Sequence, residues 1–169
     1  MNAARLADQL VRWLRSEVEA ARASGLVLGL SGGVDSAVVS RLAQQAFPDD
    51  HLSLILPIQS EERDLEDARR VAAQFGLRLR EIALDPVYDA FASTLGAQAD
   101  PDGKPDLPLA NHKARLRMIA IYYHANRERY LVAGTGNRSE LTLGDFTKYG
   151  DGGVDLLPLG HLVKSEVRE

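Results

Sequence analysis

The chain has 169 residues, of which 45% are hydrophobic and 26% charged, and it contains no cysteine. This length fits one domain, and the apolar fraction excludes a wholly disordered chain. The lack of cysteine excludes disulfides, thiolate metal sites and cysteine nucleophiles. The 20 basic and 24 acidic residues leave a net charge of −4, which argues against a nucleic-acid partner. Charged or polar residues interrupt every apolar run, so we expect a cytoplasmic protein without a membrane partner.

Hydrophobic spacing predicts helices and strands that alternate along the chain. Residues 3–22 have the spacing of an amphipathic helix, and the apolar run 26–30 is typical of a buried parallel strand. The same patterns predict further helices at 34–47, 61–75, 85–95, 109–126 and 162–169, and further strands at 52–56, 77–84 and 130–134. Such regular alternation indicates an α/β fold, a doubly wound parallel sheet with helices on both faces.

Two segments of the predicted domain bear on mobility and packing. The segment 96–108 is rich in glycine, proline and aspartate, and we expect a mobile loop within a single domain. In the helix 109–126, helical spacing predicts a stripe that faces the core, made of Leu109, Leu116, Ile119 and Tyr123. The histidines have no metal-ligand spacing, and we expect surface or helix positions for all of them: His51, His112, His124 and His161.

A glycine-rich hexapeptide, Ser31-Gly32-Gly33-Val34-Asp35-Ser36, connects the first predicted strand to a helix. Adjacent glycines permit positive φ, so successive N–H groups can point into one concavity, and the following helix adds its positive end. The loop lacks the Gly-Lys-Ser/Thr of a Walker motif and the spacing of a dinucleotide fingerprint. Asp35 would repel bare phosphate but is useful if it holds Mg²⁺. The hexapeptide therefore predicts a polyphosphate site, with a capped tight turn as the structural alternative.

Two polar segments follow the strand predicted at 130–134. Residues 134–140 read Gly-Thr-Gly-Asn-Arg-Ser-Glu, and a turn of this kind ending in Glu140 can also simply cap a helix. Residues 145–155 combine charges, hydroxyls and glycines, a composition that is also ordinary in a surface loop. In a doubly wound sheet, ligands bind beyond the carboxyl ends of the strands, so we expect functional motifs directly after strands.

The hexapeptide resembles the pyrophosphate-binding loop of the N-type ATP pyrophosphatases, whose fold is adenine nucleotide alpha hydrolase-like. With the Gly-Thr…Glu run and the run Phe-Thr-Lys-Tyr-Gly-Asp-Gly-Gly at 146–153, the chain is similar to the ammonia-dependent NAD synthetases of that superfamily. This resemblance implies ATP- and Mg²⁺-dependent amidation of deamido-NAD with ammonia through an adenylated intermediate, giving NAD, AMP and pyrophosphate. It also implies a homodimer in which deamido-NAD lies near the subunit interface.

The resemblance also implies site residues. ATP would be bound by Gly29, Leu30, Ser31, Gly32, Gly33, Val34, Asp35, Ser36, Thr135 and Lys164. Mg²⁺ would be held by Asp35 and Glu140, and deamido-NAD by Arg115, Lys148 and Asp155. The residues expected to act in catalysis are Asp35, Lys148 and Lys164. They would hold the metal and offset negative charge, because the adenylation step gathers several anionic oxygens and needs no protein nucleophile.

Two other functions remain open. One is that of another N-type ATP pyrophosphatase, an amidotransferase or a tRNA-modifying enzyme, although the chain has neither the basic stripe nor the cysteines typical of tRNA modifiers. The other is a nucleotide-binding fragment with impaired catalysis. Residues 164–169 begin a predicted helix without a stop signal, and similar synthetases continue further. We therefore expect a C-terminally incomplete domain that is weakly active at best.

Overall fold

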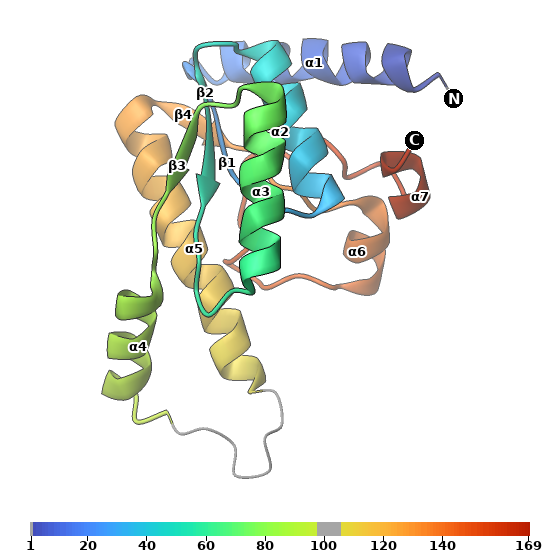
Figure 1. Ribbon diagram of the computed structural model, residues 1–169. Coiled ribbons are helices and arrows are strands. Elements are labelled where there is room, and N and C mark those ends of the chain that lie inside the picture. Colours follow the sequence, from blue (N-terminus) through green and yellow to red (C-terminus); the bar gives the residue numbers. More distant parts are fainter. Residues whose placement is uncertain (1, 98–105) are drawn as a thin grey trace.

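The computed structural model describes residues 2–97 and 106–169 (Figure 1). The strands are β1 (Gly25–Gly29), β2 (His51–Ile55), β3 (Leu79–Glu81) and β4 (Tyr130–Val132). The helices are α1 (Ala3–Ala20), α2 (Val34–Ala46), α3 (Glu62–Phe75), α4 (Asp85–Thr94), α5 (Leu107–Glu128), α6 (Arg138–Leu143) and α7 (Lys164–Val167). The strands form one sheet in the order β3-β2-β1-β4, and every pair of neighbours is parallel.

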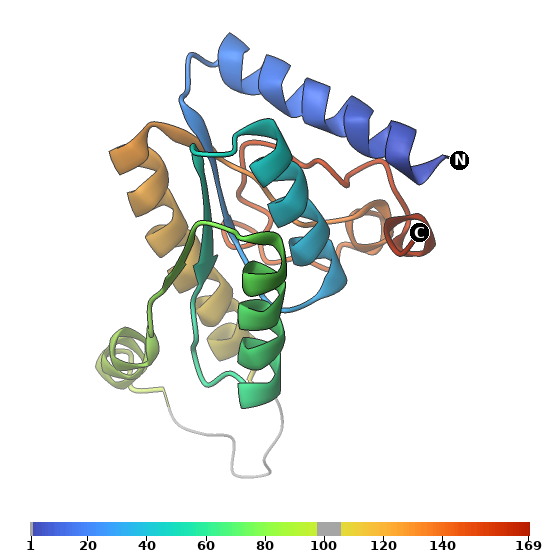
Figure 2. The ribbon, with the colours of Figure 1, turned by 45° about the horizontal axis from the view of Figure 1, so that its top comes forward.

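Helices cover both faces of the sheet, as Figures 1 and 2 show. Successive side chains of a strand point to opposite faces, and β1 is apolar on both. Leu26 and Leu28 pack with α1 and α2, whereas Val27 packs with α5 on the other face. The burial of both faces explains why the sequence of β1 is a continuous apolar run without alternation. The predicted doubly wound α/β fold is confirmed.

The strand order places the carboxyl ends of β1 and β4 next to each other. The chain adds β2 and then β3 on one side of β1, and it returns through α5 to place β4 on the other side. Val27 of β1 lies in register with Val132 of β4. Beyond β4, Ala133 forms a parallel bridge with Leu156, which brings the segment after residue 153 alongside. The loops that leave β1 and β4 therefore meet at one edge of the sheet.

The predicted elements are confirmed in type and order, but several ends differ. The strand expected at 77–84 is confined to β3, and the helix expected from residue 109 already begins at Leu107. Asp106 is its N-cap and accepts a hydrogen bond from the N–H of Leu109 at 3.1 Å, so the last two residues of the predicted loop 96–108 are helical. Residues 98–105 of that loop lie outside the described residues. Helix α6 is an element that the hydrophobic pattern missed.

The predicted core-facing stripe of α5 is wrong at two of its four positions. Leu116 is buried, but Ile119 is 67% exposed and Tyr123 is 59% exposed. The buried face instead contains Met118 and Ile121, which pack against β1, β2 and β4. This part of α5 carries apolar residues on all sides of the helix, so helical spacing alone fits more than one stripe.

Among the described residues, no helix combines the length and the apolar character needed to cross a membrane.

His51 is a core residue of β2, not the surface or helix residue that the sequence suggested. Its side chain is 1% exposed. The N–H of Arg78 donates to Nε2 at 3.0 Å, so Nε2 carries no proton and the proton is on Nδ1. Nδ1 in turn donates to the carbonyl oxygen of Phe47 at 2.9 Å. The neutral ring thus connects β2 to the end of α2 and to the segment between α3 and β3, and burial lowers the pKa of His51.

We expect His51 to make folding stability depend on pH. Because its pKa in the folded chain lies below the usual 6.5, the unfolded chain binds the additional proton as the pH falls below that value. The free energy of unfolding should therefore decrease from about pH 6.5 downward. The variant His51→Gln should be less stable by about 1–3 kcal/mol at pH 8, through its lost hydrogen bonds, and this deficit should shrink toward pH 5.

Urea unfolding at both pH values measures these free energies. The exposed His161 provides the control, because His161→Gln should reproduce the pH dependence of the wild type. A deficit of His51→Gln that is the same at pH 8 and pH 5 would contradict the prediction.

Candidate functional site

The hexapeptide after β1, residues 31–36, folds into a loop that its serine hydroxyls hold together, and we call it the phosphate loop after its predicted role. Ser36 Oγ donates to the carbonyl oxygen of Gly33 at 2.9 Å and accepts the N–H of Ser31 at 3.1 Å. The N–H of Gly33 donates to Ser31 Oγ at 3.3 Å. Gly32 adopts φ +88°, in the left-handed region, and the carbonyl oxygen of Asp64 in α3 would lie 2.4 Å from a Cβ at this position. Glycine is therefore required at position 32 both by conformation and by space.

The loop leads directly into α2 in the way expected of an anion site. Gly33 is the N-cap of α2 and has no side chain to bind the N–H groups of the first turn. Those groups, together with the positive end of the helix, can bind phosphate oxygens. Asp35 lies in the same first turn and is only 9% exposed. A buried carboxylate at this place attracts a cation to the edge of the phosphate loop.

Asp35, Glu140 and Lys164 come together from three separate helices, and we call them the Lys164 cluster. Lys164 Nζ forms an ion pair with Asp35 Oδ2 and lies 3.9 Å from Glu140 Oε1. Asn137 Nδ2 lies 3.5 Å from Asp35 Oδ1. The Lys164 backbone N–H donates to Ser139 Oγ at 3.3 Å, which attaches the start of α7 to α6. The predicted ATP and metal residues from distant parts of the chain are thus adjacent.

Glu140 also has the helix-capping role that the sequence left open. Its Oε2 accepts the N–H of Asn137 at 3.0 Å, and Asn137 Oδ1 accepts the N–H of Glu140 at 3.2 Å. This reciprocal pair is a capping box, and it explains how the six-residue helix α6 begins where no hydrophobic pattern predicts it. Capping uses Oε2, while Oε1 is directed toward Lys164. One carboxylate therefore starts α6 and contributes negative charge to the Lys164 cluster.

The predicted deamido-NAD residues divide into two places. Arg115 of α5 donates from Nε to the backbone carbonyl oxygen of Lys148 at 3.1 Å, so these two basic residues are neighbours. Lys148 Nζ lies 4.9 Å from the centre of the Tyr149 ring. Tyr149 has φ +62° and is 71% exposed. Lys148 and Tyr149 therefore present a cation and an aromatic ring together on the surface, an arrangement suited to a flat anionic ligand.

Asp155 is bound to the end of β4. Its Oδ2 accepts the N–H of Val132 at 2.8 Å, and its Oδ1 accepts the hydroxyl of Tyr122 at 2.9 Å. Burial, the larger cause, and the hydrogen bond to the Asp155 carboxylate, the smaller one, together raise the pKa of Tyr122 to about 12. Asp155 thus has a structural role, joining α5 to the segment that runs beside β4.

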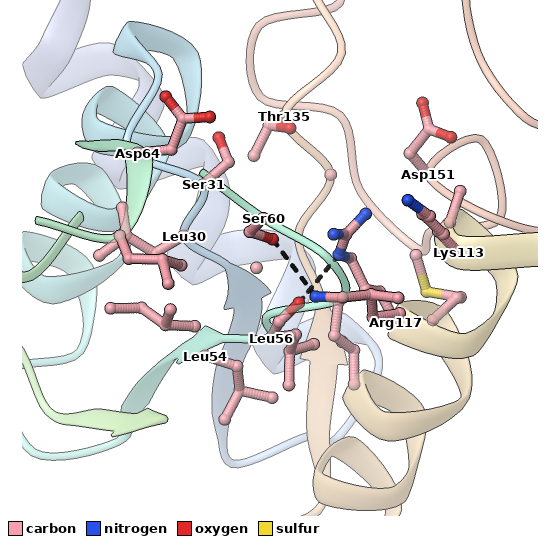
Figure 3. Close-up of a pocket in the computed structure, with 18 of the residues that line it drawn as sticks. Leu30, Ser31, Leu54, Leu56, Ser60, Asp64, Lys113, Arg117, Thr135 and Asp151 are labelled. Atoms are coloured by element: carbon pink, nitrogen blue, oxygen red, sulfur yellow. Dashed lines mark hydrogen bonds between the residues drawn. The ribbon is translucent and has the colours of Figure 1, made fainter. Parts of the chain in front are cut away.

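A cavity of about 530 Å³ lies between the phosphate loop and α5 (Figure 3). Its floor is apolar and is formed by Leu54, Leu56, Met118, Ile121 and Val132. The predicted ATP residues that line the cavity are Gly29, Leu30, Ser31 and Thr135. The other predicted ATP residues do not line it and belong to the remainder of the loop and to the Lys164 cluster. A cavity of this size and character suits a nucleoside whose phosphates rest on the loop.

Sequence reasoning missed several polar residues that line this cavity, namely Ser60, Asp64, Lys113 and Arg117. Lys113 and Arg117 are one helical turn apart on α5, and both lie on the face that turns toward the cavity. Their spacing was visible in the sequence, but a lysine and an arginine on a helix usually face solvent. Only the packing of α5 against β1 and β4 indicates that this polar stretch faces a binding site.

The carboxylates of the site do not by themselves complete a metal site. Across the described residues, no group of three or more acidic or histidine side chains is arranged to hold a metal ion. Asp35 and Glu140 provide oxygen donors on either side of one cation, Lys164 Nζ. Mg²⁺ is commonly bound by one or two carboxylates together with substrate phosphates. The donor set therefore fits Mg²⁺ that arrives with a nucleotide.

Comparison with known proteins gives a consistent result. The family model described as NAD synthase matches residues 6–169. An NH3-dependent NAD+ synthetase of Carboxydothermus hydrogenoformans is 53% identical over 96% of this chain and 66% of its own length. One of Finegoldia magna is 44% identical over 100% of this chain and 68% of its own length. The chain therefore spans about two thirds of the length of these curated relatives.

Solved structures have the same fold. The structure of NMN synthetase from Francisella tularensis matches 99% of this chain and 68% of its own, with a TM-score of 0.91 and 34% identity. An NH3-dependent NAD synthetase from Campylobacter jejuni, in complex with nitrate ion, matches 99% of this chain and 71% of its own, with a TM-score of 0.89 and 34% identity.

The two glycines of the loop should differ sharply in their tolerance of a side chain. Gly32→Ala should lower the free energy of unfolding by more than about 2 kcal/mol, since the left-handed backbone alone costs about 1–2 kcal/mol and the new Cβ would collide with α3. Gly33→Ala is the matched control, because Gly33 has φ −73° and its Cβ would meet only Ser31 Oγ at 3.4 Å. Its effect should stay within about 1 kcal/mol. Urea unfolding measures both, and equal losses would contradict the assignment.

Proposed function

This chain belongs to the NAD synthase family, and on that premise we propose that it amidates deamido-NAD with ammonia at the expense of ATP. The observation that carries the proposal is the position of the Lys164 cluster beside a phosphate loop and a nucleoside-sized cavity. This arrangement suits a reaction at the phosphates of ATP. A cytoplasmic location is part of the proposal, because ATP and nicotinamide dinucleotides are used there.

The proposed reaction has two steps. First, a carboxylate oxygen of the nicotinate forms a bond to the α-phosphorus of ATP, and pyrophosphate leaves with the electron pair of the broken P–O bond. Ammonia then attacks the acyl carbon of the adenylate, AMP leaves, and the nitrogen releases a proton to solvent. The loop 31–36 and the N-terminus of α2 would bind the phosphates that become pyrophosphate. Lys164 would offset the charge that pyrophosphate carries as it leaves.

We assign Mg²⁺ binding to Asp35 and Glu140 of the Lys164 cluster. Both carboxylates direct an oxygen toward the same cation, Lys164 Nζ, so they can share another cation of similar position. Mg²⁺, when bound, would neutralise phosphate charge and orient the leaving group. Asn137 and the capping box hold Glu140 in place independently of any ligand. The chain thus offers rigid carboxylates before the nucleotide arrives.

The nicotinate half of the substrate is assigned to Arg115 and Lys148. These neighbouring cations would attract an anionic dinucleotide, and the Tyr149 ring beside them offers a flat surface. Asp155 remains a proposed deamido-NAD residue, and its hydrogen bonds to β4 and Tyr122 support a role in holding the segment in place. In this proposal, ATP binds at the phosphate loop and the nicotinate carboxylate of deamido-NAD binds on the side of Lys148.

Turnover tests this function directly. The chain, incubated with deamido-NAD, Mg-ATP and ammonium, should form NAD and AMP in equal amounts. Lys148→Gln should raise KM for deamido-NAD by about 10- to 100-fold while leaving KM for ATP unchanged, since a hydrogen bond from a charged group is lost. Lys148→Arg, which keeps the charge, is the matched control and should recover part of the loss.

The same assay separates the alternatives. ATP binding without release of AMP would instead indicate a nucleotide-binding fragment. Because one similar structure is that of an NMN synthetase, nicotinate mononucleotide is offered as a competing substrate. Preferential amidation of that mononucleotide would overturn the assignment to the dinucleotide. An equal effect of Lys148→Gln on both KM values would contradict the placement of deamido-NAD.

We also propose that the chain forms a homodimer through α5. Ile119 and Tyr123 lie one helical turn apart and are largely exposed although apolar. Ile119→Arg should convert the dimer to a monomer, because a charge buried at an interface is costly. Leu143→Arg is the control, since Leu143 is 82% exposed on α6 and its replacement should leave the dimer intact. Sedimentation equilibrium measures both, and a wild-type monomer would overturn the proposal.

A further inference from the structure

Arg117 is a cation of the cavity wall that forms no ion pair with any carboxylate of the described residues. Its Nε donates to the carbonyl oxygen of Leu56, at the end of β2, at 3.0 Å. Among the described residues, no carboxylate oxygen lies within 4.0 Å of its guanidinium. Asp85 acts on it only from a longer distance, and burial lowers the pKa of Arg117. Figure 3 shows the terminal nitrogens pointing into the cavity, away from Leu56.

A purely structural role does not account for this charge. One neutral donor, such as an amide, would satisfy the Leu56 carbonyl without the cost of removing a full charge from water. Arginine remains protonated at any physiological pH, so the positive charge stays in the wall. Its Nε hydrogen bond holds the planar group, and the donors of the terminal nitrogens stay directed at the cavity. Such a fixed cation, whose terminal nitrogens have no hydrogen-bond partner among the described residues, is suited to an anionic ligand.

The surroundings identify which anion could reach Arg117. The floor of the cavity is apolar, and Ser31 and Thr135 line the end next to the phosphate loop. A nucleotide with its terminal phosphates on the loop and its nucleoside in the cavity has one phosphate between these two places. That group is the α-phosphate. Lys113, the other cation on this helix face, has its Nζ 5.3 Å from the centre of the Tyr88 ring and makes a cation–π contact there, whereas Arg117 has no such partner among the described residues.

We propose that Arg117 binds the α-phosphate of the nucleotide and stabilises the charge on its oxygens during adenylation. This inference rests on the proposed function, which it deepens by adding a residue at the reacting phosphorus. Arg117 gives and takes no proton. While the carboxylate–phosphorus bond forms and the bond to pyrophosphate breaks, the guanidinium donates hydrogen bonds to the non-bridging oxygens. Its Leu56 anchor means that little reorganisation is needed at that moment.

Binding of adenosine and of AMP to the chain separates a phosphate contact from a structural role. The two ligands differ only by the phosphate, so the ratio of their dissociation constants measures how much the phosphate contributes to binding. The wild type should bind AMP more tightly than adenosine. In Arg117→Gln the ratio should fall by at least about tenfold, while adenosine affinity stays within about twofold, because only the charged hydrogen bonds are lost. Arg117→Lys keeps the charge without the planar fork and should lie in between.

Controls keep this result interpretable. Arg127→Gln removes an exposed charge from the same helix and should leave the ratio unchanged. Adenosine affinity itself reports whether the cavity survives the substitution at Arg117. If adenosine and AMP weaken equally, Arg117 only shapes the cavity, and the proposal is overturned. An unchanged ratio in Arg117→Gln overturns it as well.

Kinetics on the same variants distinguish this proposal from the proposed function. Arg117→Gln should lower kcat for NAD formation by about tenfold or more, because charge on the α-phosphate is greatest in the transition state. The wild type could form no AMP from ATP and deamido-NAD while Arg117→Gln still lowers the ratio of AMP affinity to adenosine affinity. That outcome would refute the amidation reaction and leave the Arg117 contact standing. A wild type that binds neither adenosine nor AMP would overturn the Arg117 contact.

Discussion

The pairing of β1 on both of its edges is the constraint on which the site depends. β2 lies on one side of this strand and β4 on the other, and helices cover both of its faces. Only the two ends of β1 are therefore left for a binding site. At its carboxyl end the chain must turn at once into α2, within a space that admits no Cβ at Gly32. The tight turn of the loop at 31–36 is therefore a consequence of dense packing as well as a candidate binding site.

Around this edge the structure distributes charge in a way that suits nucleotide chemistry. Carboxylates and Lys164 form a compact cluster at one end of the loop, whereas Arg115 and Lys148 lie together elsewhere. A reaction between two anionic substrates needs cations of this kind more than it needs a nucleophile.

How well the sequence predicted the structure varied with the range of the interaction. The alternation of strands and helices depends on neighbouring residues and was predicted correctly, as was the place of the glycine-rich loop between β1 and α2. The role of that loop as a phosphate site stays a prediction. The exposed face of α5 was not, because apolar residues surround that helix and only the sheet decides which side it covers. His51 was misplaced for a related reason: its partners Phe47 and Arg78 are brought to it by α2 and α3, and no local pattern reports them.

The sequence by itself determined the fold class, the position of the phosphate loop and the residues of its family signature. These features rest on short-range patterns: apolar runs, helix periodicity and adjacent glycines. Tertiary structure alone decided that Lys164 meets Asp35 and that Arg117 faces the cavity without an ion pair to any described carboxylate. The physical reason is that contacts between residues far apart in the chain follow from strand order and helix packing. That packing decides whether a charged residue of a helix, such as Arg117, faces solvent or the cavity.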